Sequence, residues 1–451
     1  MSKSKNAKIK QSLVQTRERR KNQIPLVFPL KIVNQHKAWF NEYMKKLNLM
    51  FLESKWLYNH IIADTDNRLN DCAWKLSTVE IKVGEQMETR EIKTLTSQMR
   101  QGVIKTIKQN LLSLKAIKEK GNKVGRLKFK KISNSILLPQ YGNTYKFTNE
   151  QKTKVKIQGF ERPFRVLGGH QIPNDAQIAN AYLVRKPSGI HLHVTCYVDK
   201  DKYKFIWENK TNRHGQIVNR IWNEFDKPIG VDFKPDGIVL SNGLIFRVRI
   251  PETDKLKRLQ RKLSRQKQNS KNYEKTRLKL RREYERITNK KLDAANKIAS
   301  YLYRYSTVYF QDEDIKSWHK KRKEMNFSKS IQQSIVGVIQ RRLKNSLRTP
   351  TVMLDRFTPT TKTCSKCGHK VEKLELKDRV FVCPKCGQII DRDQNAAINM
   401  LRYGGLGNLG QDMSEVTPVE WKTAARTMGC SHVLISQATV KQEAQSLMGF
   451  A

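Results

Sequence analysis

The amino-acid sequence predicts an α+β protein with several domains. Three features lead to this prediction: a length of 451 residues, a helical apolar pattern over residues 34–120, and strand-like stretches that follow residues 121–125. At roughly 150 residues per domain, this length corresponds to about three domains. Because 38% of the residues are hydrophobic, the chain can form buried cores, and a fully disordered protein is excluded.

The first half of the chain divides by its apolar patterning. Residues 1–23 are basic and lack an apolar segment, so we expect a flexible arm, and residues 24–33 have the character of a short strand. Apolar residues then recur at helical spacing through residues 34–120, which predicts packed helices. From about residue 125 to 220, alternation and turn residues predict a β-rich unit in which RLKFKKI forms a strand.

The second half begins with three expected strands at residues 228–250, joined by turns at KPDG and SNG. Residues 255–300 are strongly basic with apolar edges, and the polar break QNSKN within them predicts a helical hairpin. A buried strand is expected at residues 306–318 and a helix at about 328–347. The tail, residues 405–451, has a net charge of −1, so we expect it to be loosely ordered and to make no phosphate contacts.

The charge balance points to a polyanionic partner. Lys and Arg number 88 and Asp and Glu number 41, which gives a formal net charge of +47. Such a surplus causes strong self-repulsion unless a polyanion neutralises it, and nucleic acid is the leading candidate. A membrane surface is the alternative, but the sequence has no run of 18 apolar residues and no signal peptide. We therefore expect a cytoplasmic protein without a membrane partner.

Four of the seven cysteines form the strongest local motif. Two Cys-x2-Cys pairs, Cys364 with Cys367 and Cys383 with Cys386, are separated by 15 residues. Zinc favours four tetrahedral ligands, and thiolates at this spacing supply them. The sequence therefore predicts one structural zinc ion, bound in a closed site that takes no part in catalysis. The other three cysteines are scattered, which argues against a disulfide framework.

A second motif consists of carboxylates that lie far apart in the sequence. Asp232 interrupts the apolar strand IGVDF, Glu313 ends the strand at 306–318, and Asp393 lies at the start of the DRDQNAAIN helix. A charged side chain within a buried strand is costly without a partner such as a cation. If the three converge, they can bind two Mg2+ ions that activate water at a phosphodiester.

Each carboxylate also has an alternative interpretation. Asp393 could serve as the N-terminal cap of its helix, although Asp391 is the better candidate for that role. Asp312 and Asp314 flank Glu313, so either of them could replace it as the metal ligand.

These motifs occur together in an order that resembles one family closely. IGVDFKPDG, the basic hairpin, the strand ending in EDI, TKTCSKCGH…CPKCG and DRDQNAAINM follow the order of transposon-encoded TnpB proteins and of miniature type V CRISPR effector nucleases. The resemblance covers residues 225–405, and it reaches weakly into residues 24–65, where FLESKWLYNHII contains a similar Tyr-Asn pair.

The resemblance implies a domain organisation. It comprises a helical recognition lobe, a wedge-like β-barrel, and an RNase H-like (RuvC) α/β nuclease domain with an inserted zinc ribbon. The implied boundaries are a flexible arm at 1–23, the barrel at 24–33 and 121–224, the helical lobe at 34–120, the RuvC-like domain at 225–357 and 391–404 with its basic hairpin at 255–300, the zinc ribbon at 358–390, and the tail at 405–451.

The resemblance also implies a function, that of an RNA-guided DNA endonuclease whose partners are a guide RNA and a double-stranded DNA target. The family's catalytic, Mg2+-binding residues fall on Asp232, Glu313 and Asp393, with Ile315 in place of the usual leucine. In this class, base pairing supplies the sequence specificity. The candidates for contact with the nucleic-acid backbone are Arg126, Lys128, Lys130 and Lys131.

Other interpretations stay open at this point. Trp39, Trp56 and Trp74 are either core residues, which their helical spacing favours, or platforms on which bases stack. The chain could also be a guide-dependent repressor that binds without cleaving, or a transposase that joins DNA strands. The sequence does not decide between a transposon-derived and a CRISPR-derived guide, nor between a monomer and a homodimer.

Overall fold

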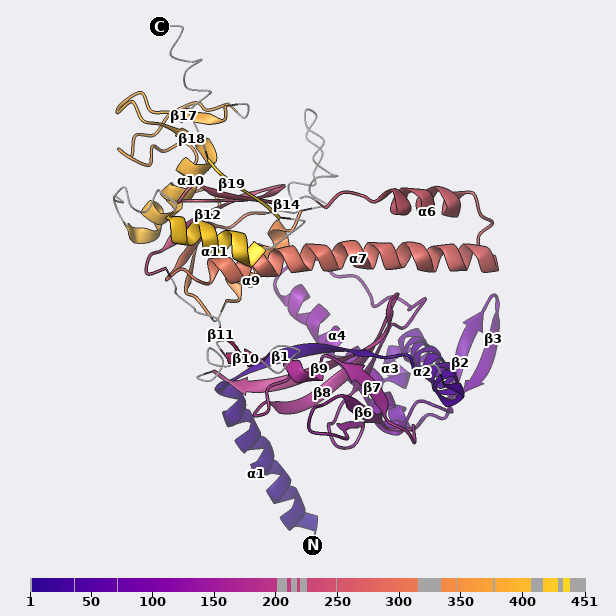
Figure 1. Cartoon of the computed structure of the whole chain (residues 1–451). Helices are drawn as coiled ribbons and strands as arrows, with labels where there is room; N and C mark the ends of the chain where they lie inside the picture. Colours follow the sequence, from indigo (N-terminus) through magenta and orange to yellow (C-terminus); the bar gives the residue numbers. More distant parts are fainter. Residues whose placement is uncertain are drawn as a thin grey trace. The chain divides into compact units, whose positions relative to one another are not determined.

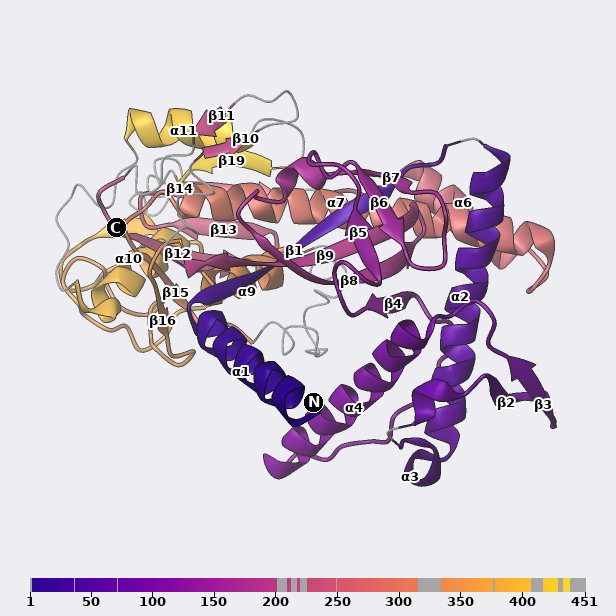
Figure 2. The ribbon, with the colours of Figure 1, turned by 90° about the horizontal axis from the view of Figure 1, so that it is seen from below.

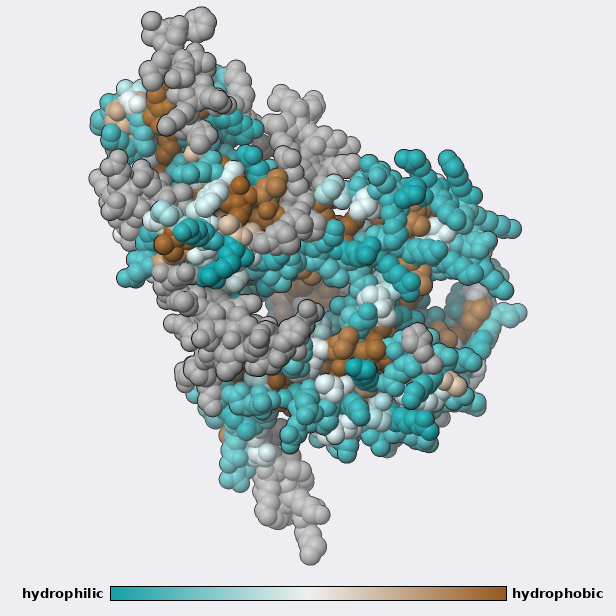
Figure 3. Space-filling model, in the orientation of Figure 1, coloured by the Kyte–Doolittle hydropathy of each residue, from teal (hydrophilic) through white to brown (hydrophobic). Residues whose placement is uncertain are grey.

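A computed structural model divides into two compact units, Met1–Asn219 and Arg220–Ala451, which are described separately (Figure 1). The structure describes residues 2–35, 37–70, 72–200, 209–211, 217–219, 225–248, 250–314, 334–346, 348–375, 378–406, 417–428 and 433–438. None of the helices in these ranges is long and apolar enough to cross a membrane. Hydrophilic residues cover most of the described surface visible in Figure 3.

The first unit is built on a seven-stranded, barrel-like sheet that is nearly closed (Figure 2). The central strand β1, Gln23–Ile32, pairs with β9 on one side and with β7 on the other, and the pairings in this sheet are antiparallel. Every second residue of β9 is buried, so one face of the strand forms the core. The strand order is β4 (Ser135–Leu138), β8 (Gln177–Lys186), β9 (Gly189–Asp199), β1, β7 (Phe164–Leu167), β6 (Lys154–Ile157) and β5 (Tyr145–Phe147).

Two long helices, α2 (Ala38–Ala63) and α4 (Ser97–Glu119), pack against each other and against β4. The buried carboxylate of Glu53 on α2 accepts hydrogen bonds from the backbone N–H groups of residues 93–95, at 2.7 to 3.0 Å. These bonds fix the segment that leads into α4. The shorter elements are α3 (Thr65–Arg68), η1 (Ala73–Lys75), the hairpin β2 (Thr78–Val83) and β3 (Gln86–Glu91), η2 (Gly169–Gln171), and the pair β10 (Asn209–Thr211) and β11 (Ile217–Asn219).

Three local expectations differ from the structure of this unit. Residues Ser2–Lys21 form a helix, α1, instead of an irregular arm, because Lys, Arg and Gln are good helix formers whatever their charge. The β2–β3 hairpin interrupts the region expected to be purely helical. The RLKFKKI stretch is not a strand, and residues 122–130 have no regular secondary structure.

The second unit is built on a six-stranded mixed sheet. β12 (Ile229–Lys234), β15 (Val308–Gln311) and β16 (Thr351–Leu354) are parallel neighbours, whereas β13, β14 and β19 extend the sheet antiparallel beyond β12. The remaining elements are β13 (Gly237–Leu240), β14 (Leu244–Val248), β17 (Val380–Val382), β18 (Ile389–Asp391), α9 (Val336–Lys344), α10 (Arg392–Leu401), the π-helical turn η4 (Arg402–Leu406), α11 (Pro418–Met428) and β19 (Val433–Gln437).

The expected basic hairpin is present as α6, Asp254–Ser264, followed by α7, Lys271–Leu302. The side chains of Thr253 and Ser270 cap the N-termini of the two helices, where each accepts a bond from a backbone N–H group. Lys255 of α6 forms an ion pair with the buried Glu283 of α7, which fastens the two helices together. Beyond the hairpin, α7 continues along α9 and α11 (Figure 1).

The expectation of a loosely ordered tail is wrong for its described part. Residues of β19 pair in antiparallel register with β14, and α11 packs against α7. Pro418 occupies the first position of α11, where a missing N–H group costs nothing. The sequence prediction gave weight to net charge, which says nothing about the pairing of a five-residue strand.

Glu420 connects α11 to the sheet from a fully buried position. Its carboxylate pairs with Lys227 Nζ at 3.1 Å and accepts hydrogen bonds from Tyr305 Oη at 2.8 Å, Asn242 Nδ2 at 3.1 Å and the Thr417 amide at 2.8 Å. Burial raises the pKa of this carboxyl, but the Thr417 amide, Tyr305 and Lys227 together hold the pKa below its ordinary value. The charged form is therefore part of the folded structure.

The helix α10 packs directly on the central strand β12. A Cβ atom added to Gly230 would overlap the carbonyl oxygen of Ala397, so only glycine permits this approach. The helix also contacts β13 and β15, and Ala396, Ala397 and Leu401 are buried. This packing fixes the position of the N-terminus of α10 against the sheet.

We predict that Glu420→Gln destabilises the second unit at neutral pH by about 1–3 kcal/mol, because the buried partners lose a charge. The pKa of Glu420 is lower in the folded chain than its ordinary value of 4.5. The stabilisation is therefore complete above roughly pH 4.5 and is lost as the pH falls through the folded pKa. Denaturant unfolding across a pH series measures the difference between wild type and variant, which should shrink on acidification. Asp293→Asn, which removes an exposed carboxylate from a surface pair, is the control; a difference that widens in acid would contradict the assignment.

We predict that Gly230→Ala lowers the free energy of unfolding by about 1–3 kcal/mol, because the new methyl group must push α10 away from β12. Gly125→Ala is the matched control, since an added Cβ there meets no atom within 4 Å. Thermal or denaturant unfolding of the full chain measures both variants. Equal stability of the two would show that α10 does not pack as described.

Candidate functional site

Two of the predicted carboxylates lie at the same edge of the six-stranded sheet. Asp232 is part of β12, and Glu313 follows the end of β15 by two residues. The two strands are parallel, with Val231 opposite Phe310. Because parallel strands end at the same edge, both carboxylates belong to the carboxyl end of this sheet, where ligand sites of α/β sheets form.

Asp393 reaches this edge from α10. Ala397 contacts Gly230, and Asp393 precedes Ala397 by one helical turn, about 6 Å along the axis. Asp232 follows Gly230 by two residues, about 6.6 Å along the strand and on the same face. The ion pair between Asp393 and Lys234, which follows Asp232 by two residues on β12, places Asp393 at this edge.

Asp391, not Asp393, caps the helix. One oxygen of Asp391 accepts hydrogen bonds from the backbone N–H groups of Asp393 and Gln394, each at 3.0 Å. The carboxylate of Asp393, which is 7% exposed, instead meets basic groups. It pairs with Lys234 Nζ, and its other oxygen lies 3.8 Å from Arg392 Nε. The capping alternative for Asp393 is thus excluded.

The electrostatics of this edge are those of a crowded acidic site. Burial raises the pKa of Asp232 to about 7, and the negative charges of Glu313 and Asp391 act in the same direction, whereas Lys234 and Arg392 oppose them. Burial likewise lowers the pKa of Lys234, which the carboxylates of Asp391 and Asp232 partly offset. A carboxyl group with such a raised pKa in a partly enclosed position is typical of functional sites.

The sequence analysis missed Lys234 and Arg392, the two cations within this site. Lys234 lies two residues after Asp232, so the period of two in a strand places both side chains on the face that α10 covers. The position of Lys234 on the same face as Asp232 could therefore have been predicted from the sequence. Arg392 follows the capping residue Asp391, and the adjacent charges gave no indication that it faces Asp232.

The flanking acids of the 312–314 cluster have partners of their own. Asp312 pairs with Lys344 Nζ at 2.5 Å and with Arg356 Nη2 at 3.4 Å, and the Lys344 bond lowers its pKa. Asp314 lies 3.8 Å from Arg356 Nη1. Glu313 is the member of the cluster whose charge acts on Asp232. This arrangement favours Glu313 as the member that serves the site.

Among the described residues, the carboxylate oxygens of the triad are less closely grouped than the cysteine sulfurs. The sulfurs of the four cysteines all lie within 4.8 Å of one another, and among the described residues the three acids form no such group. A pair of ions about 4 Å apart needs a wider set of ligands than one ion does. Oxygen donors are the ligands that Mg2+ favours, so the chemistry of the triad fits such ions, with Lys234 between the carboxylates.

The cysteine cluster has the geometry of a tetrahedral metal site. Cys364 and Cys386 have sulfurs 3.6 Å apart, and those of Cys367 and Cys383 are 3.5 Å apart. Four sulfurs at about 2.3 Å from a tetrahedral zinc ion would be about 3.8 Å apart. Each Cys-x2-Cys pair is followed by a turn of the same kind. In it a glycine with positive φ donates its N–H group to the carbonyl of the first cysteine, Gly368 to Cys364 and Gly387 to Cys383. The four thiols could therefore hold a metal such as zinc.

Two asparagines of α10 connect the cysteine module to the acidic edge. Asn395 donates to the carbonyl of Thr363 at 2.8 Å and accepts from the Ser365 amide at 2.9 Å. Asn399, one turn later, donates to the carbonyls of Thr360 and Thr363. Both asparagines are fully buried. The same helix thus carries Asp393, packs on β12 and anchors the metal-binding loops.

The four predicted nucleic-acid contacts lie in the irregular segment of the first unit. Arg126, Lys128 and Lys131 are exposed, as a backbone contact requires. Lys130 is half-buried, with Nζ 3.7 Å from the ring centre of Tyr58, and Asn59 exchanges two hydrogen bonds with its backbone. The Tyr-Asn pair of α2 therefore holds this segment in place.

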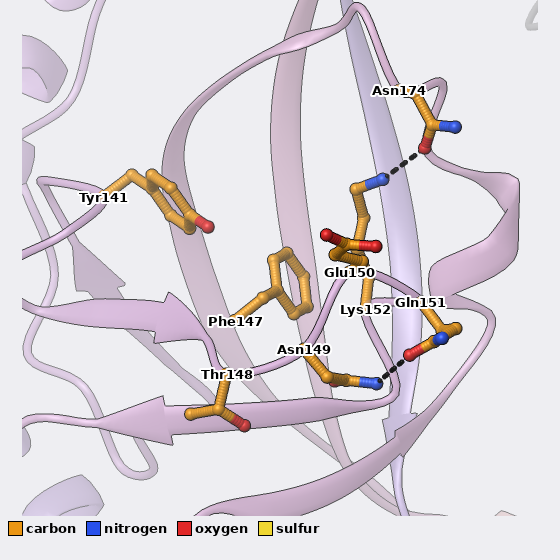
Figure 4. Close-up of a pocket in the computed structure, with 8 residues that line it drawn as sticks. All are labelled: Tyr141, Phe147, Thr148, Asn149, Glu150, Gln151, Lys152 and Asn174. Atoms are coloured by element: carbon orange, nitrogen blue, oxygen red, sulfur yellow. Dashed lines mark hydrogen bonds between the residues drawn. The ribbon is translucent and has the colours of Figure 1, made fainter.

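A pocket of about 800 Å³ on the first unit does not contain the chemistry of the acidic edge (Figure 4). Tyr141 and Phe147 line one part of it. Lys152 donates to Asn174 and Asn149 donates to Gln151, so these polar groups bind one another. Its single lysine faces the pocket together with Glu150, and we assign it no reaction.

Comparison with known proteins supports the family resemblance. Residues 340–400 match the family model described as Cas12f1-like, TNB domain. A candidate RNA-guided DNA endonuclease of Streptomyces pristinaespiralis is 32% identical over 154 residues, which is 33% of this chain and 37% of the relative. The predicted resemblance is confirmed.

Two further comparisons cover short or distant matches. The CRISPR-associated DNA-binding protein Cas12m of Thermanaerosceptrum fracticalcis is 43% identical over 51 residues, 11% of this chain and 8% of the relative. The structure of a Cas12f1–sgRNA–target DNA complex matches with a TM-score of 0.41 at 14% identity, covering 84% of this chain and 99% of that one. The chain spans little more than a third of the length of the Streptomyces pristinaespiralis relative.

We predict that Cys364→Ser removes the bound metal ion, because a tetrahedral site with three thiolates loses its closed ligand set. The metal content of the purified full chain should fall from one ion per chain to well below one, and the unfolding temperature should drop. Cys72→Ser, at an exposed cysteine outside the cluster, is the control and should retain the ion. Full metal content in Cys364→Ser would contradict the site.

Proposed function

We propose that the chain is an RNA-guided DNA endonuclease that binds a guide RNA and cleaves complementary double-stranded DNA by Mg2+-dependent hydrolysis. The observation that carries the proposal is the placement of Asp232, Glu313 and Asp393 at one edge of the sheet by β12, β15 and α10. The segment matched by the family model includes the four cysteines and residues 392–400 of α10. We assign this unit as an RNase H-like (RuvC) nuclease domain, with residues 358–390 as its inserted zinc ribbon.

The residues divide the chemical work between them. When bound, two Mg2+ ions would supply a nucleophilic water and stabilise the leaving oxygen of the phosphodiester. Asp232, Glu313 and Asp393 would hold these ions. Lys234 pairs with Asp393, and its charge opposes the raised pKa of Asp232. The cysteine module takes no part in the reaction but holds α10, and hence Asp393, in place.

The remainder of the chain would bind nucleic acid. A guide RNA and a DNA target present enough phosphate to neutralise a net charge of +47. The protein would recognise the shape of the heteroduplex, while base pairing selects the target. We place the function in the cytoplasm of a prokaryotic cell, at the nucleoid when DNA is bound.

A second candidate function is that of a guide-dependent DNA-binding protein without cleavage. The contact of Lys234 with Asp393 favours it, because an ammonium group then occupies part of the acidic site. One relative also has a name that describes DNA binding. The presence of all three carboxylates favours the nuclease.

We predict that Asp232→Asn lowers the rate of cleavage by about a thousandfold or more, because two-metal catalysis supplies several kcal/mol of the rate enhancement. Binding of guide RNA and target DNA should stay within about twofold of wild type, since one buried carboxylate contributes little to phosphate contact. The assay incubates purified ribonucleoprotein with matched plasmid in Mg2+ and in EDTA.

Asp236→Asn, an exposed acid of the same hairpin, is the control and should cleave normally. Retained cleavage by Asp232→Asn would refute its role. If wild-type protein binds the target but leaves the plasmid intact in Mg2+, the DNA-binding candidate replaces the nuclease.

A further inference from the structure

A basic pocket of about 620 Å³ lies on the first unit, at the junction of β1, α2, β6 and β7. Its lining residues include four cations and one tryptophan, and none of them is acidic. The cations are exposed and the tryptophan is half-buried: Lys37, Lys154, Arg162, Arg165 and Trp39. The composition is therefore that of a site for an anion next to an aromatic surface.

Two of these cations are held directly opposite each other. Lys154 on β6 and Arg165 on β7 are register partners in the antiparallel pair, and both side chains point away from the core. Like charges at opposite positions destabilise a sheet. Within the described ranges, none of the four pocket cations forms an ion pair that would relieve this repulsion. A bound phosphate would relieve it.

The aromatic side of the pocket is held rigidly. The ring of Trp39 packs edge-on against Tyr43, with centroids 5.1 Å apart, and the Arg162 guanidinium lies 5.6 Å from its centroid. The Tyr43 hydroxyl accepts hydrogen bonds from the amides of Glu161 and Arg162 at 3.2 and 3.0 Å. The tryptophan and the loop that carries Arg162 are therefore fixed relative to each other before any ligand binds.

We propose that this pocket binds one unpaired nucleotide of a single-stranded nucleic acid. Lys154 and Arg165 contact its phosphate, and its base stacks on Trp39 next to Arg162, a combination typical of single-strand binding sites. RNA and DNA share this chemistry. The inference rests on the proposed function only in taking nucleic acid as the partner, and it needs no cleavage.

The test measures binding of the full-length chain to fluorescent 15-nucleotide RNA and DNA strands without secondary structure, across a salt series. For Lys154→Gln with Arg165→Gln, affinity at low salt should fall about tenfold or more. The slope of log K against log salt should become smaller by about 0.7, since the one phosphate contact that is lost on a single strand contributes about 0.7. For Trp39→Leu, affinity should fall about tenfold with an unchanged slope, and Trp39→Tyr should restore most of it.

The chain offers a matched control in Lys146→Gln with Lys156→Gln. These lysines are also register partners, on β5 and β6, but they do not line the pocket. The fold loss of affinity in the control variant should be at least about five times smaller than the fold loss in the pocket variant. Thermal unfolding checks that every variant folds. Equal losses in pocket and control pairs, or wild-type binding by Trp39→Leu on both strands, would overturn the proposal.

The two proposals can fail separately. If the pocket variants lose affinity as predicted but the wild-type protein never cleaves a guided target, the nuclease proposal is refuted and the pocket proposal is supported. A chain that cleaves its target, while the pocket variants bind both strands as wild type does, would refute the pocket alone.

Discussion

The close packing of α10 on β12 is the constraint on which the rest of the second unit depends. Glycine at position 230 lets the helix backbone approach the strand, and this contact sets where the helix begins. Asp393 then pairs with Lys234 of β12, while Asn395 and Asn399 hold the loops that carry the first cysteine pair. One helix thus links the four-cysteine module, which could hold a metal, to the acidic edge of the sheet.

The acidic edge contains basic groups supplied by the protein itself. Lys234 and Arg392 lie among the carboxylates, and their charges oppose the burial that raises the pKa of Asp232. The two cations only partly compensate the buried charge, because the pKa of Asp232 is still raised to about 7. On the proposed function, divalent ions that bind Asp393 would have to displace Lys234 from it.

Much of this site could be predicted from sequence because its signals are local. The cysteine spacing, the DRDQNAAIN helix and Asp391 as its cap each depend on residues within a few positions. The strand β19, the burial of Glu420 and the contact between Lys234 and Asp393 depend on partners more than 100 residues away. The apolar periodicity of the sequence does not predict pairings between such distant residues. The helix α1 was missed for a different reason, since net charge was given more weight than helix propensity.

The central claim is that the carboxylates on β12, after β15 and on α10 share divalent ions. Replacing Mg2+ by Fe2+ and generating hydroxyl radicals at the bound ion would cut the backbone next to its ligands, and sequencing the fragments maps the site. The account predicts cuts close to residues 232, 313 and 393 together, all suppressed by excess Mg2+. Cuts at one of these segments alone, or at none of them, would contradict it.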